Sequence, residues 1–159
     1  MVVTGPKPSM SISVSTVKYI IREWFRRKHA AQWAARVDCR TTKTFLPALY
    51  EGQFWDCLKE LKRQHARSLT YTVTGHNTLN RHLWKMGVVE SPVCSLCGQE
   101  DETTYHYLGA CDRYCALRYQ IFGGHQLTVE DLSKLFFARL TEFIVKTGRF
   151  TNDQGLNGL

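Results

Sequence analysis

The sequence of 159 residues contains no apolar run that approaches the ~20 residues needed to span a lipid bilayer. Its N-terminal stretch, MVVTGPKPSMSISV, lacks the charged segment followed by an apolar one that marks a secretory signal. Alternating strand patterns are nearly absent, and there is no internal repeat. These absences predict a mostly α-helical intracellular protein, in the nucleus, the cytoplasm or both, with no membrane partner.

Acidic residues are scarce in the first half of the chain. Residues 1–85 contain 15 Lys and Arg but 5 Asp and Glu, whereas residues 86–159 contain 6 and 9, for a net charge of +7. A basic half favours an anionic partner, RNA or single-stranded DNA, and an ordinary solvated basic surface is the alternative. Nothing in the sequence points to a small-molecule substrate.

Breaks and charge divide the chain into four expected regions. Residues 1–14 form a lead-in or linker, because Gly5, Pro6 and Pro8 disfavour regular structure. Residues 15–90 form a basic helical region. Residues 91–150 form a region with a cluster of Cys and His residues, expected below to bind zinc, and further helices. Residues 151–159 form a disordered tail.

Helical periodicity predicts amphipathic helices in the basic region. The first runs from Ser15 or Thr16 to about Arg36 with Ser15 as its N-cap, and the second from about residue 53 to 72 after a connector at 41–53. A short helix at about 77–86 places Met86 inward. The exposed faces supply these candidate nucleic-acid-binding residues: Lys18, Arg22, Arg26, Arg27, Arg36, Lys59, Arg63, Arg67, Arg81, Lys85 and Trp33. Trp33 lies among the charges, where it stacks on a base or, the favoured alternative, packs under a neighbouring segment.

The C-terminal region is also expected to be helical. One helix continues through Tyr119, and another opens at Thr128, where the letters TVED approximate a capping box. Gly148 ends it. The apolar face of this last helix comprises Leu132, Leu135, Phe136, Leu140, Phe143 and Ile144.

Three cysteines and one histidine between residues 94 and 111 have the spacing C-x2-C-x8-H-x4-C. The residues are Cys94, Cys97, His106 and Cys111, which together supply the four ligands of a tetrahedral Zn²⁺ site. Gly98 lets the chain fold back so that backbone amides point at the sulfur atoms. Cys115 is a rival for one ligand position, whereas Cys39 and Cys57 are interpreted as small apolar residues.

Four ligands close the metal site, whereas catalytic zinc sites usually keep one open position. Glu100, Asp101 and Glu102 are interpreted as an exposed acidic loop between the ligand pairs. The residues His76, Asn77, Asn80 and His82 have the composition of small metal-dependent nucleases, but those enzymes need a ββα arrangement. We therefore expect a structural zinc and no catalytic residue.

Residues 69–111 resemble the C-terminal tail of non-LTR retrotransposon polyproteins, the region that follows the reverse transcriptase and RNase H domains. The resemblance extends less specifically over about residues 5–150, through GPKP (5–8), the tryptophans Trp24 and Trp33, and Arg118. The positions that match the recurring pattern are Thr74, Gly75, His76, Leu79, Leu83, Cys94, Cys97, Glu102, Thr103, His106 and Cys111.

The resemblance implies a zinc-binding accessory module that associates with RNA or DNA, or that packs on an RNase H or reverse transcriptase domain or a host protein. It does not transfer catalysis, because the chain has no reverse-transcriptase aspartate pair, and the few, scattered acidic residues of its first half do not assemble the four-carboxylate site of an RNase H. Retroviral nucleocapsid knuckles have the spacing C-x2-C-x4-H-x4-C. The loop here is four residues longer, so their mode of base binding does not transfer.

Overall fold

The computed structural model describes residues 12–48 and 52–150. The chain divides into two compact units, with the boundary between Arg36 and Val37. The expected lead-in lies mostly outside the described residues, and the expected tail at 151–159 lies wholly outside them. The expected division at residue 90 stays a prediction about composition and charge, since the second unit includes residues from both sides of it.

The N-terminal unit contains one described helix, α1 (Val14–Ala35). Its N-cap is Ser13, whose hydroxyl accepts a hydrogen bond from the backbone N–H of Thr16 at 3.1 Å, so the prediction of Ser15 is wrong. Ser13 has the extended backbone that a cap requires, whereas Ser15 already lies in the first helical turn. No residue of α1 is buried, and apart from the half-buried Trp33 its basic side chains and its large apolar side chains are exposed.

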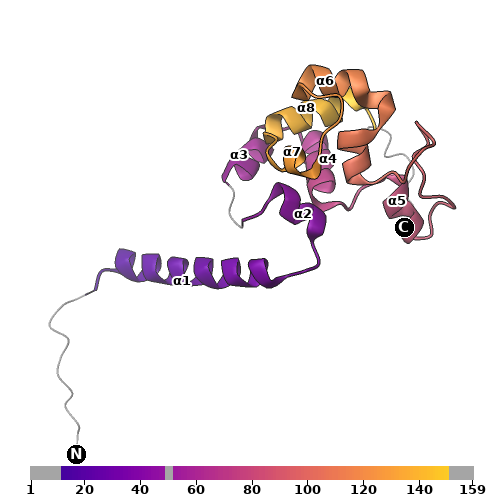
Figure 1. Cartoon of the computed structure of the whole chain (residues 1–159). Coiled ribbons are helices and arrows are strands. Elements are labelled where there is room, and N and C mark those ends of the chain that lie inside the picture. The colour runs from indigo at the N-terminus through magenta and orange to yellow at the C-terminus, as the bar shows by residue number, and fades with distance from the viewer. Residues whose placement is uncertain (1–11, 49–51, 151–159) are drawn as a thin grey trace, which may run out of the picture. The chain divides into compact units, whose positions relative to one another are not determined.

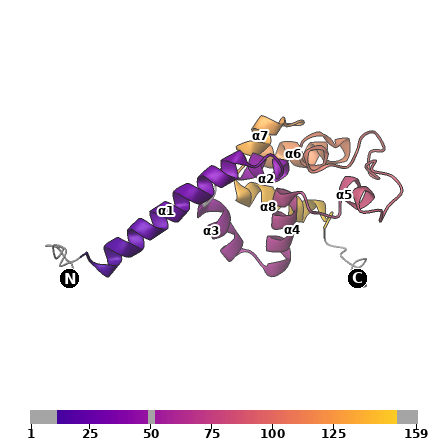
Figure 2. The same cartoon turned by 90° about the horizontal axis from the view of Figure 1, so that it is seen from below.

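The C-terminal unit is built from short helices (Figures 1 and 2). Its helices are α2 (Arg40–Phe45), α3 (Gly52–Glu60), α4 (Arg63–Thr74), α5 (Asn80–Lys85), α6 (Cys115–Phe122), α7 (Val129–Ser133) and α8 (Phe137–Thr147), together with a π-helical turn (His106–Ala110) and a 3-10 turn (Asp112–Tyr114). The described residues include no strand, only an isolated bridge between Val93 and Asp101. The expected mostly α-helical class is confirmed.

The core forms where α4 and α8 pack together (Figure 1). Leu69 and Val73 of α4 and Leu140, Phe143 and Ile144 of α8 are all almost fully buried. Burying such a side chain contributes roughly 1.5–3 kcal/mol. Because α4 precedes the Cys/His segment and α8 follows it, this core fixes both ends of the metal-bearing stretch.

Two expected elements before the Cys/His segment differ from the structure. The connector at 41–53 contains α2, which is anchored by the buried ring of Phe45. The helix expected at 53–72 is two helices, because the backbone of Lys62 is extended. Met86, expected inward, is 52% exposed, since α5 has already ended at Lys85.

The C-terminal expectations are met in part. Thr128 and Asp131 form the expected capping box. The helix it opens ends at Ser133, however, and α8 begins after a break at which Phe136 is 69% exposed and Phe137 is buried. Gly148 ends α8 as expected, and both Gly75 and Gly148 adopt the left-handed conformation at the ends of α4 and α8.

None of the described helices combines the length and the apolar composition that crossing a bilayer requires.

Candidate metal centre

The first pair of candidate ligands lies on a tight turn. Cys94 and Cys97 flank it, and the backbone N–H of Gly98 donates to the carbonyl of Cys94 at 2.8 Å. Gly98 has a φ of 68°, which glycine adopts without strain. The backbone N–H groups of Gln99 and Glu100 are directed at the Cys97 sulfur, as expected for this turn.

The second pair is joined by the π-helical turn. His106 and Cys111 are five residues apart, which in an α-helix would place them on different faces. Here the N–H of Cys111 donates to the carbonyl of His106 at 2.8 Å, an i to i+5 bond that brings the two residues to the same side of the turn. The x4 spacing therefore fits this wider turn.

The four candidate ligand atoms lie within 4.8 Å of one another, so this cluster could hold a metal ion. Cys94 Sγ lies 3.9 Å from Cys111 Sγ, and Cys97 Sγ lies 3.3 Å from His106 Nε2. Tetrahedral zinc with ordinary bond lengths separates two sulfur atoms by about 3.8 Å, and a sulfur and a nitrogen by about 3.6 Å. These two separations match tetrahedral zinc to within a few tenths of an ångström, and the remaining ones are no longer than 4.8 Å.

The pKa values of two candidate ligand thiols are shifted in opposite directions. Desolvation opposes ionisation of Cys97, but hydrogen bonds from the backbone of Gln99 and Glu100, together with Cys94 and His106, lower its pKa to about 7. Burial, reinforced by the neighbouring Cys94 and Cys97, raises the pKa of Cys111 to about 12. In the metal-free protein at neutral pH, Cys111 therefore holds its proton, and a metal must displace it.

The carboxylate of Glu100 orients the candidate histidine ligand. Glu100 Oε2 lies 3.1 Å from His106 Nδ1, which leaves Nε2 directed at the cluster. A carboxylate on the far nitrogen is the usual means by which a metal-binding histidine is fixed. Composition alone assigned Glu100 to an exposed loop; its side chain is indeed 67% exposed, but it contacts the buried His106 ring.

Glu102 corrects the interpretation of this loop as exposed. It is 1% exposed, and its two carboxylate oxygens accept hydrogen bonds from Arg149 Nε and Nη2 at 2.8 and 2.7 Å. The N–H of Asn80 donates to the same carboxylate at 2.8 Å. The carboxylate thus connects the loop to α5 and to Arg149, which follows α8. The hydrogen bonds that Arg149 donates to Glu102 are the main cause that raises the pKa of Arg149.

Cys115, the rival ligand, is not part of the cluster. Its sulfur lies 3.4 Å from His125 Nδ1. Arg118, one turn further along α6, is fully buried and donates to the backbone carbonyls of Cys111 and His125 at 2.9 and 2.7 Å. Arg118 thus holds the backbone of the Cys111 segment in place. Cys57 packs against the core as expected for a small apolar residue.

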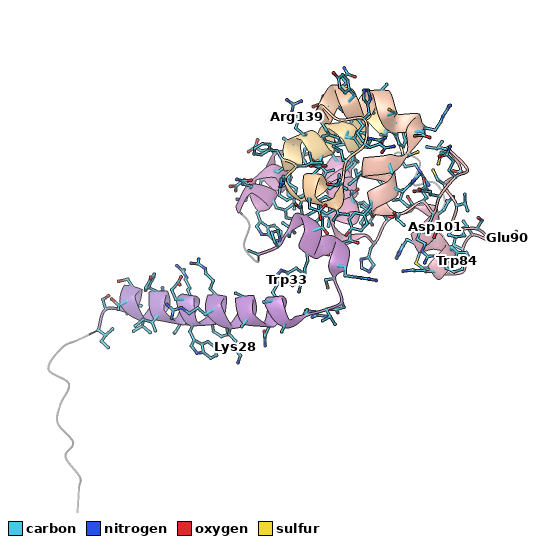
Figure 3. The ribbon with its side chains drawn as sticks, viewed as in Figure 1. Lys28, Trp33, Trp84, Glu90, Asp101 and Arg139 are labelled. Atoms are coloured by element: carbon cyan, nitrogen blue, oxygen red, sulfur yellow. The ribbon has the colours of Figure 1, made fainter. Side chains whose placement is uncertain are left out.

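The predicted nucleic-acid-binding residues are distributed over both units. Lys18, Arg22, Arg26, Arg27 and Arg36 are exposed in the N-terminal unit, and Trp33 is half-buried there. Arg26 pairs with Glu23 at 2.6 Å. Figure 3 shows Lys28 and Trp33 on opposite sides of α1.

In the C-terminal unit the predicted cations are partly engaged. Lys59 pairs with Asp56, and Arg67 Nε donates to the hydroxyl of Tyr71 at 2.8 Å. Arg81 pairs with Asp101 at 3.2 Å and covers the ring of Trp84. Arg63 and Lys85 are exposed. Figure 3 shows Trp84 and Asp101 at one end of this unit and Arg139 at the other.

This chain is similar to a retrovirus-related Pol polyprotein from the type-1 retrotransposable element R1 of Bradysia coprophila. The two are 29% identical over 111 residues, which are 69% of this chain and 10% of the relative. The chain thus matches about a tenth of the length of that polyprotein. No protein-family model and no solved structure matches the chain. The similarity supports a retrotransposon origin.

Proposed function

We propose that this chain is a non-catalytic, zinc-binding accessory module of a retrotransposon-derived protein, and that it binds single-stranded RNA or DNA. The observation that carries the proposal is the cluster of Cys94, Cys97, His106 and Cys111, which has the donor types and spacing of a closed zinc site. The similarity to a retrotransposon polyprotein supports the part of the proposal that gives the chain a retrotransposon origin.

In this proposal the metal has a structural role. Zinc bound by all four residues stabilises the folded C-terminal unit, because the unfolded chain has no preformed site. The ligands come from two turns, and the segment between them is connected to α5 and Arg149 through Glu102. The chain's own cations would contact phosphates, and salt would weaken the binding steeply.

Nucleic-acid binding is tested by titrating the zinc-loaded chain against single-stranded RNA and DNA at low and moderate salt. We expect binding at low salt, with an affinity that falls by about 0.7 logarithmic units per phosphate contact for each tenfold rise in salt. A chain that binds neither strand at low salt while containing zinc would contradict the nucleic-acid part of the proposal.

The ligand set is tested separately by comparing Cys97→Ser with Cys115→Ser. We expect Cys97→Ser to lose zinc and helicity, whereas Cys115→Ser retains about one zinc per chain, because Cys115 lies outside the cluster. Metal content by mass spectrometry and far-ultraviolet circular dichroism give the two readouts. Equal zinc in both variants would overturn the ligand assignment.

A second candidate function is a protein-interaction module that packs on an RNase H domain or a host protein without direct contact to nucleic acid. The exposed apolar side chains of α1 favour it: Ile20 is 56% exposed, Trp24 55% and Phe25 48%. Patches of this kind mark interaction surfaces. The salt titration separates the two functions, because a pure interaction module would not bind either strand.

A further inference from the structure

A cavity of about 400 Å³ lies next to the Thr-Gly-His turn that the sequence singles out. Arg40, the first residue of α2, contributes to one wall, and Arg81, His82 and Lys85 of α5 contribute to another. Gly75 and Asn77 connect these walls, and the stretch 103–105 lines the cavity as well. Positive side chains from two helices that are distant in sequence therefore converge on one hollow.

The cavity has a surplus of positive charge. Arg40 and Lys85 form no ion pair with any residue that the structure describes, and Arg81 is paired only with the half-exposed Asp101. The one acidic side chain in the lining is Glu102, and Arg149 neutralises it from outside the cavity. Burial, followed by the charges of His76 and Lys85, lowers the pKa of His82, as expected where positive charge is concentrated.

The conformation of the Thr-Gly-His turn determines the shape of the cavity between α2 and α5. Gly75 has a φ of 75°, and a Cβ atom at this position would lie 3.0 Å from Thr41 Oγ1 and 3.2 Å from Thr41 Cβ. A side chain at this position would push Thr41 aside by a few tenths of an ångström and would be strained at this φ, whereas glycine fits without either cost. Asn77 is buried and donates to the hydroxyl of Thr104 at 3.0 Å, which attaches the turn to the segment before His106. The turn thus places α2, α5 and the metal-bearing segment around one cavity.

We infer that this cavity binds a phosphate group of a nucleic-acid backbone, with Arg40, Arg81 and Lys85 as its charged contacts. Arg81 is suited to hold two phosphate oxygens at once, and the ammonium of Lys85 supplies a point charge. Thr41 and Thr103 also line the cavity. The inference rests on the proposed nucleic-acid binding and assigns to this cavity a contact separate from the basic face of α1.

The test compares a cavity variant, Arg40→Ala with Lys85→Ala, with a control that loses the same charge elsewhere. The control is Lys62→Ala with Lys134→Ala, because both lysines are exposed and neither lines the cavity. Binding of a uridine RNA oligonucleotide to the zinc-loaded full chain is measured over a range of salt. We expect the cavity variant to bind about tenfold more weakly and its salt slope to fall by about 1.4, while the control stays close to wild type.

The outcomes separate the two proposals. If the wild-type chain does not bind the RNA oligonucleotide at low salt, the proposed nucleic-acid binding fails. If the wild type binds but the cavity variant matches the control, the function stands and the cavity assignment is overturned. Zinc content and circular dichroism establish that both variants are folded.

Amide chemical shifts give a second measurement on the wild-type chain. We expect the oligonucleotide to move the resonances of Gly75, Arg81 and His82. Shifts confined to α1 would overturn the assignment. Inorganic phosphate is titrated as a second probe. If phosphate shifts the same resonances and the oligonucleotide does not, the cavity binds free phosphate, and the assignment to a nucleic-acid phosphate is overturned.

Discussion

Glu102 shows how one buried charge connects distant parts of the chain. Its carboxylate accepts hydrogen bonds from Arg149 and from the N–H of Asn80, and Arg149 also donates to the carbonyl of Thr78 at 3.2 Å. Removing one partner from a buried ion pair leaves the other charge without compensation. The Glu102–Arg149 pair therefore matters for stability mainly because removing either residue leaves the other charge buried without a partner.

We expect Glu102→Gln to destabilise the C-terminal unit by about 3 kcal/mol, because the guanidinium of Arg149 would lose its bidentate partner while remaining largely buried. Urea unfolding monitored by circular dichroism measures the change. Glu90→Gln is the matched control, since Glu90 is exposed and forms no ion pair with any described residue (Figure 3). A change below 1 kcal/mol for Glu102→Gln would contradict this role.

The ligand cluster could be predicted from sequence because metal coordination demands particular residue types at short spacings. The structure brings together the four residues that the spacing indicated. The role of Glu102 could not be predicted, because its partner Arg149 lies 47 residues away and acidic residues in a polar loop are usually exposed. Glu100 was missed for a related reason: its contact with His106 depends on how the loop folds back.

Among the helical elements, the π-helical turn (His106–Ala110) depends on Gly109 for its close packing against the backbone of Leu127. Gly109 is buried in this turn, and its carbonyl accepts a hydrogen bond from the N–H of Leu127 at 3.0 Å. A Cβ atom on Gly109 would lie 2.5 Å from the carbonyl oxygen of Leu127. The obstacle is backbone, so it cannot be relieved by rotating a side chain.

We therefore expect Gly109→Ala to destabilise the protein by about 2 kcal/mol, within the range typical of overpacking, and to weaken zinc binding because the turn carries His106 and Cys111. Gly52→Ala provides the control, since a Cβ there meets nothing within 4 Å. Thermal unfolding and zinc affinity are measured for both variants. Equal stability of the two would show that the turn tolerates the extra methyl group.

Helical periodicity predicted α1 and most of α4 and α8, and residue type predicted the cap at Thr128 and the helix end at Gly148. It could not locate the breaks between α3 and α4 or between α7 and α8. Neither break contains a glycine or proline, and Lys62 and Phe136 adopt extended backbone because the flanking helices each turn an apolar face to the common core. Tertiary packing overrode local preference at both places.

For the molecule as a whole, zinc binding is expected to depend on pH. The ligand thiols must be deprotonated, and Cys111, with a pKa raised to about 12, carries a proton at neutral pH until the metal displaces it. Affinity therefore rises with pH and is lost as the solution is acidified. Between pH 8 and pH 6 we expect the zinc dissociation constant to increase at least about tenfold per pH unit.

Competition with a chromophoric chelator at several pH values measures this dependence. Calorimetry in two buffers of different ionisation enthalpy counts the protons released. Cys115→Ser serves as the control and should keep the wild-type dependence, because its thiol lies outside the cluster. A dissociation constant independent of pH would contradict displacement of a proton from Cys111.

The division of the chain into two units after Arg36 has a consequence for the affinity of the proposed nucleic-acid binding. Exposed cations lie in both units, on α1 and in the unit that begins at Val37. If both units bind nucleic acid as proposed, the second unit meets the strand held by the first at an effective concentration that the connection between the units sets. The affinity of the joined pair can then exceed that of either unit alone by about a hundred- to ten-thousand-fold. The chain would then bind long strands far more tightly than strands too short to reach both units.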